Sequence, residues 1–167
     1  MELGAADRER SAALNAAVGA LHRRERTVAE LREWLLGREL RADLVDDVLT
    51  ELVEVGELDD ERFASAFAAD KRELSGWGSE RIEAALTDRG LDPRLAETAA
   101  SEPRESGLER ATELLRRRGD PLHDEASRTR ALSFLTRRGY GYELAYDAIR
   151  LAGREAAVQR HRPGHGQ

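Results

Sequence analysis

Four histidines and one acidic run are the side chains best suited to chemistry in this sequence. The chain has no cysteine that could complete a zinc site with its histidines, which are His22, His123, His161 and His165. The run Asp59, Asp60 and Glu61 could hold a cation, but helix capping and the positive end of a helix dipole explain the same residues with fewer assumptions. We therefore predict no catalytic residues, no cofactor, no metal site and no enzymatic activity.

A tryptophan between two glycines marks an expected turn. Residues 76–78 read Gly-Trp-Gly and lack the lysine that a phosphate-binding loop requires after its last glycine. The two glycines instead predict a break between helices. A tryptophan in a turn is unfavourable unless it packs or binds, so we expect Trp77 to pack between modules, with partner binding as the alternative.

Arginine supplies almost all of the positive charge, because Lys71 is the only lysine among 27 basic residues. Residues 104–138 contain nine arginines and six acids, so this strip is locally basic. The triplet 116–118 and the pair 137–138 close two expected helices, where the helix dipole favours cations. A solvated helix end and a binding surface explain them equally well. As candidate partner-binding residues we take Arg62, Lys71, Trp77, Arg81, Arg89, Arg116, Arg117, Arg118, Arg137 and Arg138.

Three short helices in residues 57–102 are expected to position several of these side chains. Asp59 can cap the first helix, and Gly90 is placed to take the left-handed conformation after the second. Pro93 suits the first turn of the third helix, where its missing N–H group is harmless. Thr27 and Glu30 likewise form a capping box for an earlier helix. No alternating apolar run is long enough to predict a strand.

The middle pattern occurs three times. Leu35, Leu86 and Leu135 lie 51 and 49 residues apart, and each opens a stretch with an arginine and a large apolar residue at matching places. Such a period indicates a tandem helical array. The first copy has Glu39 where the others have glycine; a left-handed non-glycine residue costs about 1 kcal/mol, so we expect that turn to differ. We predict an all-α fold, an elongated tandem array of three-helix repeats over residues 10–56, 57–102 and 105–153, between disordered tails at 1–9 and 154–167.

Composition restricts the class of protein. The 167 residues carry a net charge of −6, with 36% charged, 40% hydrophobic and 5% aromatic residues. This acidity argues against nonspecific nucleic-acid binding by the whole molecule. The missing cysteines suit a reducing compartment, and neither a secretion signal nor a membrane-length apolar run is present. We expect a cytoplasmic protein, monomeric and not membrane-bound.

Three stretches resemble the RecX family of recombinase regulators. The central one is residues 56–64, GELDDERFA, with WGSERI at 77–82 and LTDRGL at 86–91. Residues 26–31 are similar to that family's N-terminal repeat. Residues 114–118 and 130–140 are similar to its C-terminal repeat. The resemblance covers roughly residues 10 to 152, and its weight comes from the order and spacing of the motifs.

The resemblance implies a negative regulator of the RecA recombinase. Members of the family bind RecA and its filament on single-stranded DNA, and they inhibit ATP hydrolysis and strand exchange by blocking filament growth or promoting disassembly. The implied processes are homologous recombination, DNA repair and the SOS response, with weak direct DNA contact allowed. The alternative from the residues alone is a helical DNA-binding transcription regulator, and a scaffold for an unrelated helical partner is a third reading.

Overall fold

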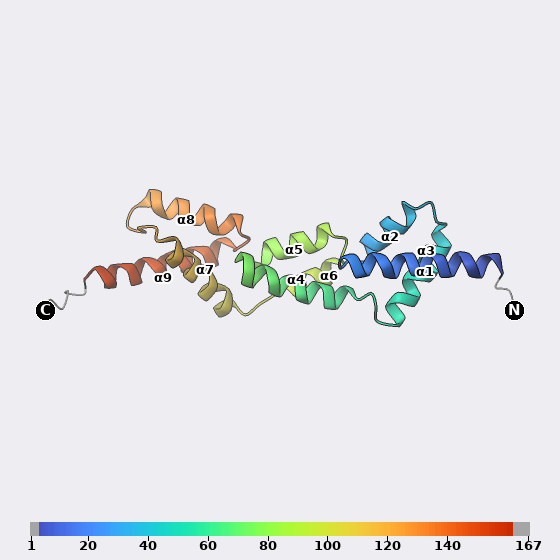
Figure 1. The fold of residues 1–167 in the computed structure, drawn as a ribbon. Helices are drawn as coiled ribbons and strands as arrows, with labels where there is room; N and C mark the ends of the chain where they lie inside the picture. Colours follow the sequence, from blue (N-terminus) through green and yellow to red (C-terminus); the bar gives the residue numbers. More distant parts are fainter. Residues whose placement is uncertain (1–3, 162–167) are drawn as a thin grey trace. The chain divides into compact units, whose positions relative to one another are not determined.

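The computed structural model describes residues 4–161, which form helices and no strand (Figure 1). The helices in this range are α1 (Ala5–Arg23), α2 (Val28–Leu36), α3 (Ala42–Glu54), α4 (Asp60–Ser75), α5 (Ser79–Asp88), α6 (Pro93–Ala100), α7 (Arg104–Arg118), α8 (Glu125–Arg137) and α9 (Tyr142–Arg160). The all-α prediction is confirmed.

The structure confirms most of the helix caps and turn residues that the sequence predicts. The Thr27 hydroxyl accepts a hydrogen bond from the Glu30 N–H at 3.1 Å, and the Glu30 carboxylate accepts one from the Thr27 N–H at 3.2 Å, completing the capping box. The Asp59 carboxylate accepts from the Arg62 N–H at 2.9 Å at the start of α4. Gly90 is left-handed with φ of 84°, and Pro93 is the first residue of α6.

The turn at Glu39 was expected to differ from the other copies, but its left-handed conformation does not. Glu39 has φ of 63°, in the same left-handed region as Gly90 at 84° and Gly139 at 87°. Its side chain is exposed to solvent, so the residue meets only the intrinsic cost of this conformation. The left-handed position is therefore kept with a residue other than glycine. The hydrogen bonds from the Leu91 and Tyr140 N–H groups to the Leu86 and Leu135 carbonyl oxygens have no counterpart at Leu40 within residues 4–161.

The chain divides into two compact units, and the division passes through the middle repeat. The first unit extends to Phe67 and includes Ala85–Ala99, whereas the second comprises Ala68–Ala84 and the chain from Ala100 onward. Helices α1 and α9 reach Ala5 and Arg160, into the ranges for which the sequence predicted disordered tails. Those tails otherwise lie outside the described residues, and the boundaries of the three repeats stay a prediction.

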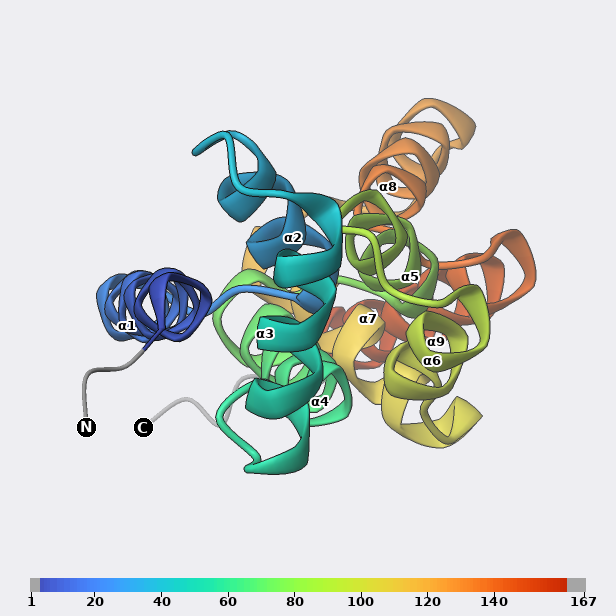
Figure 2. The same ribbon diagram turned by 90° about the vertical axis from the view of Figure 1, so that its right-hand side faces the viewer.

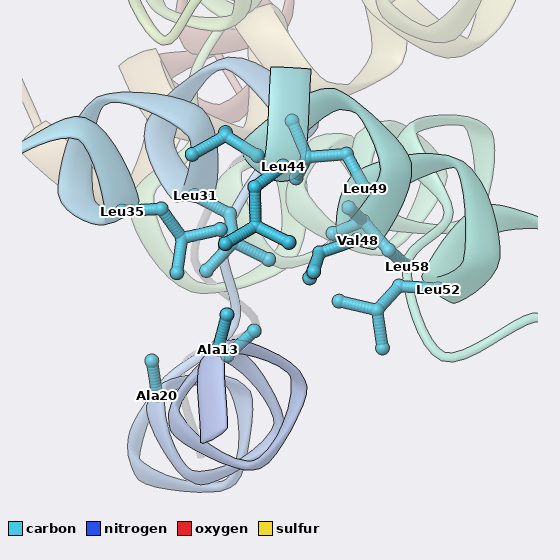
Figure 3. Close-up of a cluster of buried hydrophobic side chains, with 11 residues drawn as sticks. Ala13, Ala20, Leu31, Leu35, Leu44, Val48, Leu49, Leu52 and Leu58 are labelled. Atoms are coloured by element: carbon cyan, nitrogen blue, oxygen red, sulfur yellow. The ribbon is translucent and has the colours of Figure 1, made fainter. Parts of the chain in front are cut away.

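The first unit has a core of leucine, valine and alanine. Helix α1, seen along its axis in Figure 2, packs against α2 and α3. Figure 3 shows its small residues Ala13 and Ala20 facing the leucine side chains of those two helices, which allows close approach. The buried residues are Ala13, Ala17, Ala20, Leu31, Leu35, Leu44, Val45, Val48, Leu49, Leu52 and Leu58.

The turn that follows α5 packs on the first residues of α2 within this unit. The Thr27 hydroxyl donates a hydrogen bond to the Arg89 carbonyl oxygen at 2.8 Å. A β-carbon added to Gly90 would lie 2.5 Å from the Ala29 β-carbon. Glycine at position 90 therefore serves both the left-handed conformation and the close contact.

The second unit repeats this arrangement with the turn that follows α8. The Gly78 N–H donates to the Arg138 carbonyl oxygen at 2.7 Å, and the Glu80 N–H donates to the Gly139 carbonyl oxygen at 3.1 Å. A β-carbon on Gly139 would lie 2.4 Å from the Arg81 backbone nitrogen. In the same unit, α9 packs against α7 and α8 around a core that includes Leu135 and Tyr140. The Arg-Gly turn of one predicted repeat thus rests on a helix start of the preceding one in each unit.

Candidate partner-binding surface

Arg89 is half-buried in the first unit. Its guanidinium donates to both carboxylate oxygens of Glu30, at 2.7 and 2.8 Å, and lies 4.4 Å from the centre of the Phe63 ring. The hydrogen bonds from Arg89 lower the pKa of Glu30, although burial of this carboxyl acts in the opposite direction. Arg89 holds the turn after α5 against α2, so it is a structural residue.

Arg62 stabilises the turn before α4 and keeps an accessible side chain. Both of its terminal nitrogens lie 3.1 Å from the Gly56 carbonyl oxygen, and one lies 3.8 Å from the Asp59 carboxylate. The side chain is 61% exposed. It therefore remains a candidate for contact with a partner.

Lys71, Trp77 and Arg81 come together in the second unit. The Lys71 ammonium lies 4.8 Å from the centre of the Trp77 ring, and the Arg81 guanidinium lies 4.1 Å from it. The backbone N–H of Trp77 also donates to the Lys71 carbonyl oxygen at 3.1 Å, which fixes the turn after α4. Cations at these distances are attracted by the indole, so the half-buried tryptophan orients both of them.

Arg137 and Arg138 join the same group from the end of α8. Arg81 donates to the Arg137 carbonyl oxygen at 3.1 Å, and Arg138 donates to the Ser75 carbonyl oxygen at 2.6 Å. The Arg137 side chain is exposed and forms no ion pair within residues 4–161. We call Lys71, Trp77, Arg81, Arg137 and Arg138 the Trp77 cluster. The sequence predicted each of its members, but their juxtaposition depends on contacts between residues more than 50 positions apart.

The arginine triplet at the end of α7 is largely neutralised by acids. Arg116 donates to both carboxylate oxygens of Glu155, at 2.7 and 2.8 Å, and Arg117 donates to Glu113 at 2.9 Å. These contacts lower the pKa of Glu113 and Glu155 and raise the pKa of Arg116. The Nε atom of Arg118 lies 2.6 Å from a carboxylate oxygen of Asp120. The triplet is therefore a weaker binding candidate than the Trp77 cluster.

Two groups of arginines around an aromatic ring were not predicted from the sequence. The Phe134 ring has the Arg118 and Arg138 guanidiniums at 4.4 and 4.6 Å from its centre, in the second unit. In the first unit, Trp34 has three arginines within 6.0 Å of its ring centre, namely Arg23, Arg26 and Arg38. The signal in the sequence is the density of arginines on both sides of α2, but a tryptophan within a helix does not show which of these arginines it contacts.

The described residues offer binding chemistry more readily than catalytic chemistry. No three histidine, aspartate or glutamate side chains in this part of the chain are placed to share a metal ion. None of the described helices combines the length and hydropathy needed to cross a bilayer. Oriented cations beside aromatic rings can bind carboxylates or phosphates, which makes the Trp77 cluster the best-formed candidate interface.

Family models match two segments of the chain. A model described as the first three-helix domain of RecX matches residues 13–52, and a model of the second three-helix domain of RecX matches residues 59–99. Both segments fall within the first two predicted repeats.

Several relatives and solved structures are similar over most of their length. The regulatory protein RecX of Mycolicibacterium smegmatis is 31% identical, with 90% of this chain and 82% of the relative covered. That of Trichlorobacter lovleyi is 33% identical, with 77% and 88% covered. A crystal structure of RecX from Lactobacillus salivarius has a TM-score of 0.77 at 21% identity, covering 86% of this chain and 96% of that one, which shows a shared fold.

Proposed function

The chain belongs to the RecX family, and we propose that it is a negative regulator of the RecA recombinase. In this proposal it binds RecA, above all the filament on single-stranded DNA. It lowers ATP hydrolysis and strand exchange by blocking filament extension or promoting disassembly. It acts as a monomer in the cytoplasm. The relatives carry the name of a regulatory protein and not of an enzyme, which fits a role exerted by binding alone.

The observation that carries the proposal is the near full-length similarity to regulatory proteins of this family, combined with the Trp77 cluster. The similarity to the Mycolicibacterium smegmatis protein spans 158 residues. The cluster adds three cations, Lys71, Arg81 and Arg138, whose positions are already fixed by an indole ring or by backbone carbonyl oxygens. Fixing these side chains before binding lowers the entropy that a partner must overcome.

Two separate surfaces favour a partner made of repeated subunits. The first unit offers Arg62 and the arginines around Trp34, and the second offers the Trp77 cluster. A filament presents the same protomer many times, so each surface can meet a different protomer. Two linked contacts then bind more tightly than either alone, because the second is intramolecular.

The direct test is the ATPase rate of RecA on single-stranded DNA, titrated with this protein. We expect inhibition at amounts well below one molecule per RecA, as blocked filament growth requires. DNA binding by this protein alone, measured at two salt concentrations, is the control. Absence of inhibition at equimolar protein, together with no co-sedimentation with RecA filaments, would overturn the proposal.

A second candidate function, direct binding to nucleic acid, is favoured by the aromatic rings inside the arginine clusters. Such rings beside cations suit stacked bases and phosphates. Binding to bare DNA through several phosphates weakens steeply as salt rises. Tight, salt-sensitive binding to DNA without any effect on RecA would favour this candidate, a helical transcription regulator.

A further inference from the structure

A groove of about 700 Å³ runs between α8 and α9 in the second unit. Its apolar lining includes Leu122, Leu132 and Ile149, and two of these, Leu122 and Ile149, also belong to the buried core. Gly153 lies opposite Leu122, where its missing side chain leaves room. The volume is within the range of about 300–1,000 Å³ that is typical of ligand sites. No member of the Trp77 cluster lines this groove.

The groove carries positive charge on an acidic protein. Its lining contains four arginines and a single acid, Glu125. Arg128 donates to the Leu122 carbonyl oxygen at 3.2 Å, and Arg150 pairs with Asp147. Arg154 and Arg160 are exposed and have no ion pair within the described part of the chain. The whole chain carries a net charge of −6, whereas the groove lining has an excess of cations.

An exposed tyrosine completes the lining. Tyr146 is 54% exposed and lines the groove, whereas Tyr142, one turn earlier on α9, is 67% exposed and does not. Tyrosine buries a large ring with little loss of conformational entropy and keeps a polar hydroxyl for the edge of an interface. Tyr146 is therefore suited to be an anchor for a bound segment.

We propose that the α8–α9 groove binds an acidic amphipathic helix of a partner protein. Apolar residues of such a helix, spaced three and four positions apart, would cover Leu132, Ile149 and Tyr146. Its flanking carboxylates would pair with Arg154 and Arg160. Nucleic acid is the poorer occupant, because a phosphate backbone leaves an apolar lining in contact with charge. The inference stands apart from the Trp77 cluster and from the identity of the recombinase.

The test is fluorescence anisotropy with a designed peptide as the probe. The peptide is a labelled helix with leucines on one face and glutamates on both flanks, compared with a scrambled sequence of the same composition and with a labelled single-stranded oligonucleotide. We expect saturable binding of the helix, and no saturable binding of the scrambled peptide. Raising the salt concentration should weaken this binding, since part of the affinity is ionic.

Matched variants locate the binding to the groove. Tyr146→Ala and the double change Arg154→Glu with Arg160→Glu should each weaken peptide binding about tenfold, which corresponds to about 1.4 kcal/mol. The controls are Tyr142→Ala and the double change Arg94→Glu with Arg130→Glu, which alter exposed residues outside the groove and should leave the affinity unchanged. All of these positions are exposed, so the variants should fold.

Three results would overturn the inference. One is no saturable binding of the helical peptide. Another is equal loss of affinity in the groove variants and their controls. The third is oligonucleotide binding that Tyr146→Ala weakens as much as peptide binding, which would assign the groove to nucleic acid. None of these results depends on whether the protein inhibits RecA, so failure here is distinguishable from failure of the proposed function.

Discussion

Gly90 lies so close to Ala29 that a β-carbon added to the glycine would stand 2.5 Å from the alanine β-carbon. The two residues are 61 positions apart in the sequence. Their contact seats the turn after α5 on the start of α2, beside the hydrogen bond from the Thr27 hydroxyl to the Arg89 carbonyl oxygen. Gly139 and Arg81 form the equivalent contact in the second unit.

Gly90→Ala should destabilise the protein by about 2–4 kcal/mol. The left-handed conformation costs about 1 kcal/mol for alanine, and the overlap with Ala29 adds a packing penalty. The measurement is urea unfolding followed by circular dichroism. The matched control is Gly56→Ala, because Gly56 is left-handed as well but has open space around it, so only about 1 kcal/mol should be lost. Equal losses in both variants would contradict the role of the contact.

The Glu30–Arg89 pair should make the first unit sensitive to acid. Hydrogen bonds from Arg89 lower the pKa of Glu30, so the folded state binds this proton less readily than the unfolded state. The resulting stability is present above the ordinary glutamate pKa of 4.5 and is lost as the pH falls through the lowered value. Unfolding free energies should therefore fall less steeply between pH 5 and pH 3 in Glu30→Gln than in the unchanged protein. Identical pH slopes would argue against this source of acid sensitivity.

Tyr140 should make the second unit sensitive to alkali. Burial raises the pKa of its hydroxyl to about 12, and the same hydroxyl donates to the Gly76 carbonyl oxygen at 3.1 Å. The folded state holds this proton above the ordinary tyrosine pKa of 10, where the unfolded chain releases it, so stability should fall as the pH rises above about 10. Tyr140→Phe should remove this loss, at the cost of about 1 kcal/mol at neutral pH for the missing hydrogen bond. Tyr142→Phe, at an exposed site, is the control and should change neither value.

The Trp77 cluster should be needed for the proposed inhibition of RecA. The double change Lys71→Ala with Arg137→Ala removes two of its cations and leaves the core untouched, so we expect the concentration for half-inhibition of the RecA ATPase to rise about tenfold. Arg116→Ala with Arg117→Ala removes the same charge from residues that are already paired with acids and should change inhibition much less. A larger effect of the second variant would indicate that the end of α7, and not the Trp77 cluster, is needed for the inhibition of RecA.

Local patterns predicted the helices better than the contacts between them. Thr27, Asp59 and Pro93 act within a few residues of their own position, so their roles can be read from spacing alone. The pairing of Arg89 with Glu30, 59 residues away, depends on how two helices meet, and no short pattern encodes that meeting. For Arg116 the sequence left a solvated helix end and a binding surface equally open, and it gave no sign that Glu155 from α9 neutralises this arginine.

The candidate site was predictable as a set of residues and not as an arrangement. Trp77 could be chosen from the sequence because an indole in a glycine-rich turn must pack or bind, and its role in binding stays a prediction. Phe134 was missed, since an aromatic residue within an apolar helical face gives no sign of the two guanidiniums that stack on it. The α8–α9 groove was missed for a similar reason, because Leu132 of α8 and Tyr146 of α9 line the same groove only through the packing of α8 on α9.

Glu39 sets a rule for anyone who would lengthen this protein by design. Its turn has the same handedness as those at Gly90 and Gly139. At these two glycines an added β-carbon would lie within 2.5 Å of the helix start that packs there, so the β-carbon of Glu39 would exclude an equivalent packing partner. The helix start of an added repeat could therefore not pack on residues 38–40 unless position 39 were glycine. In an engineered repeat protein, Glu39 would prevent a further repeat from packing on this turn, and Glu39→Gly would permit it.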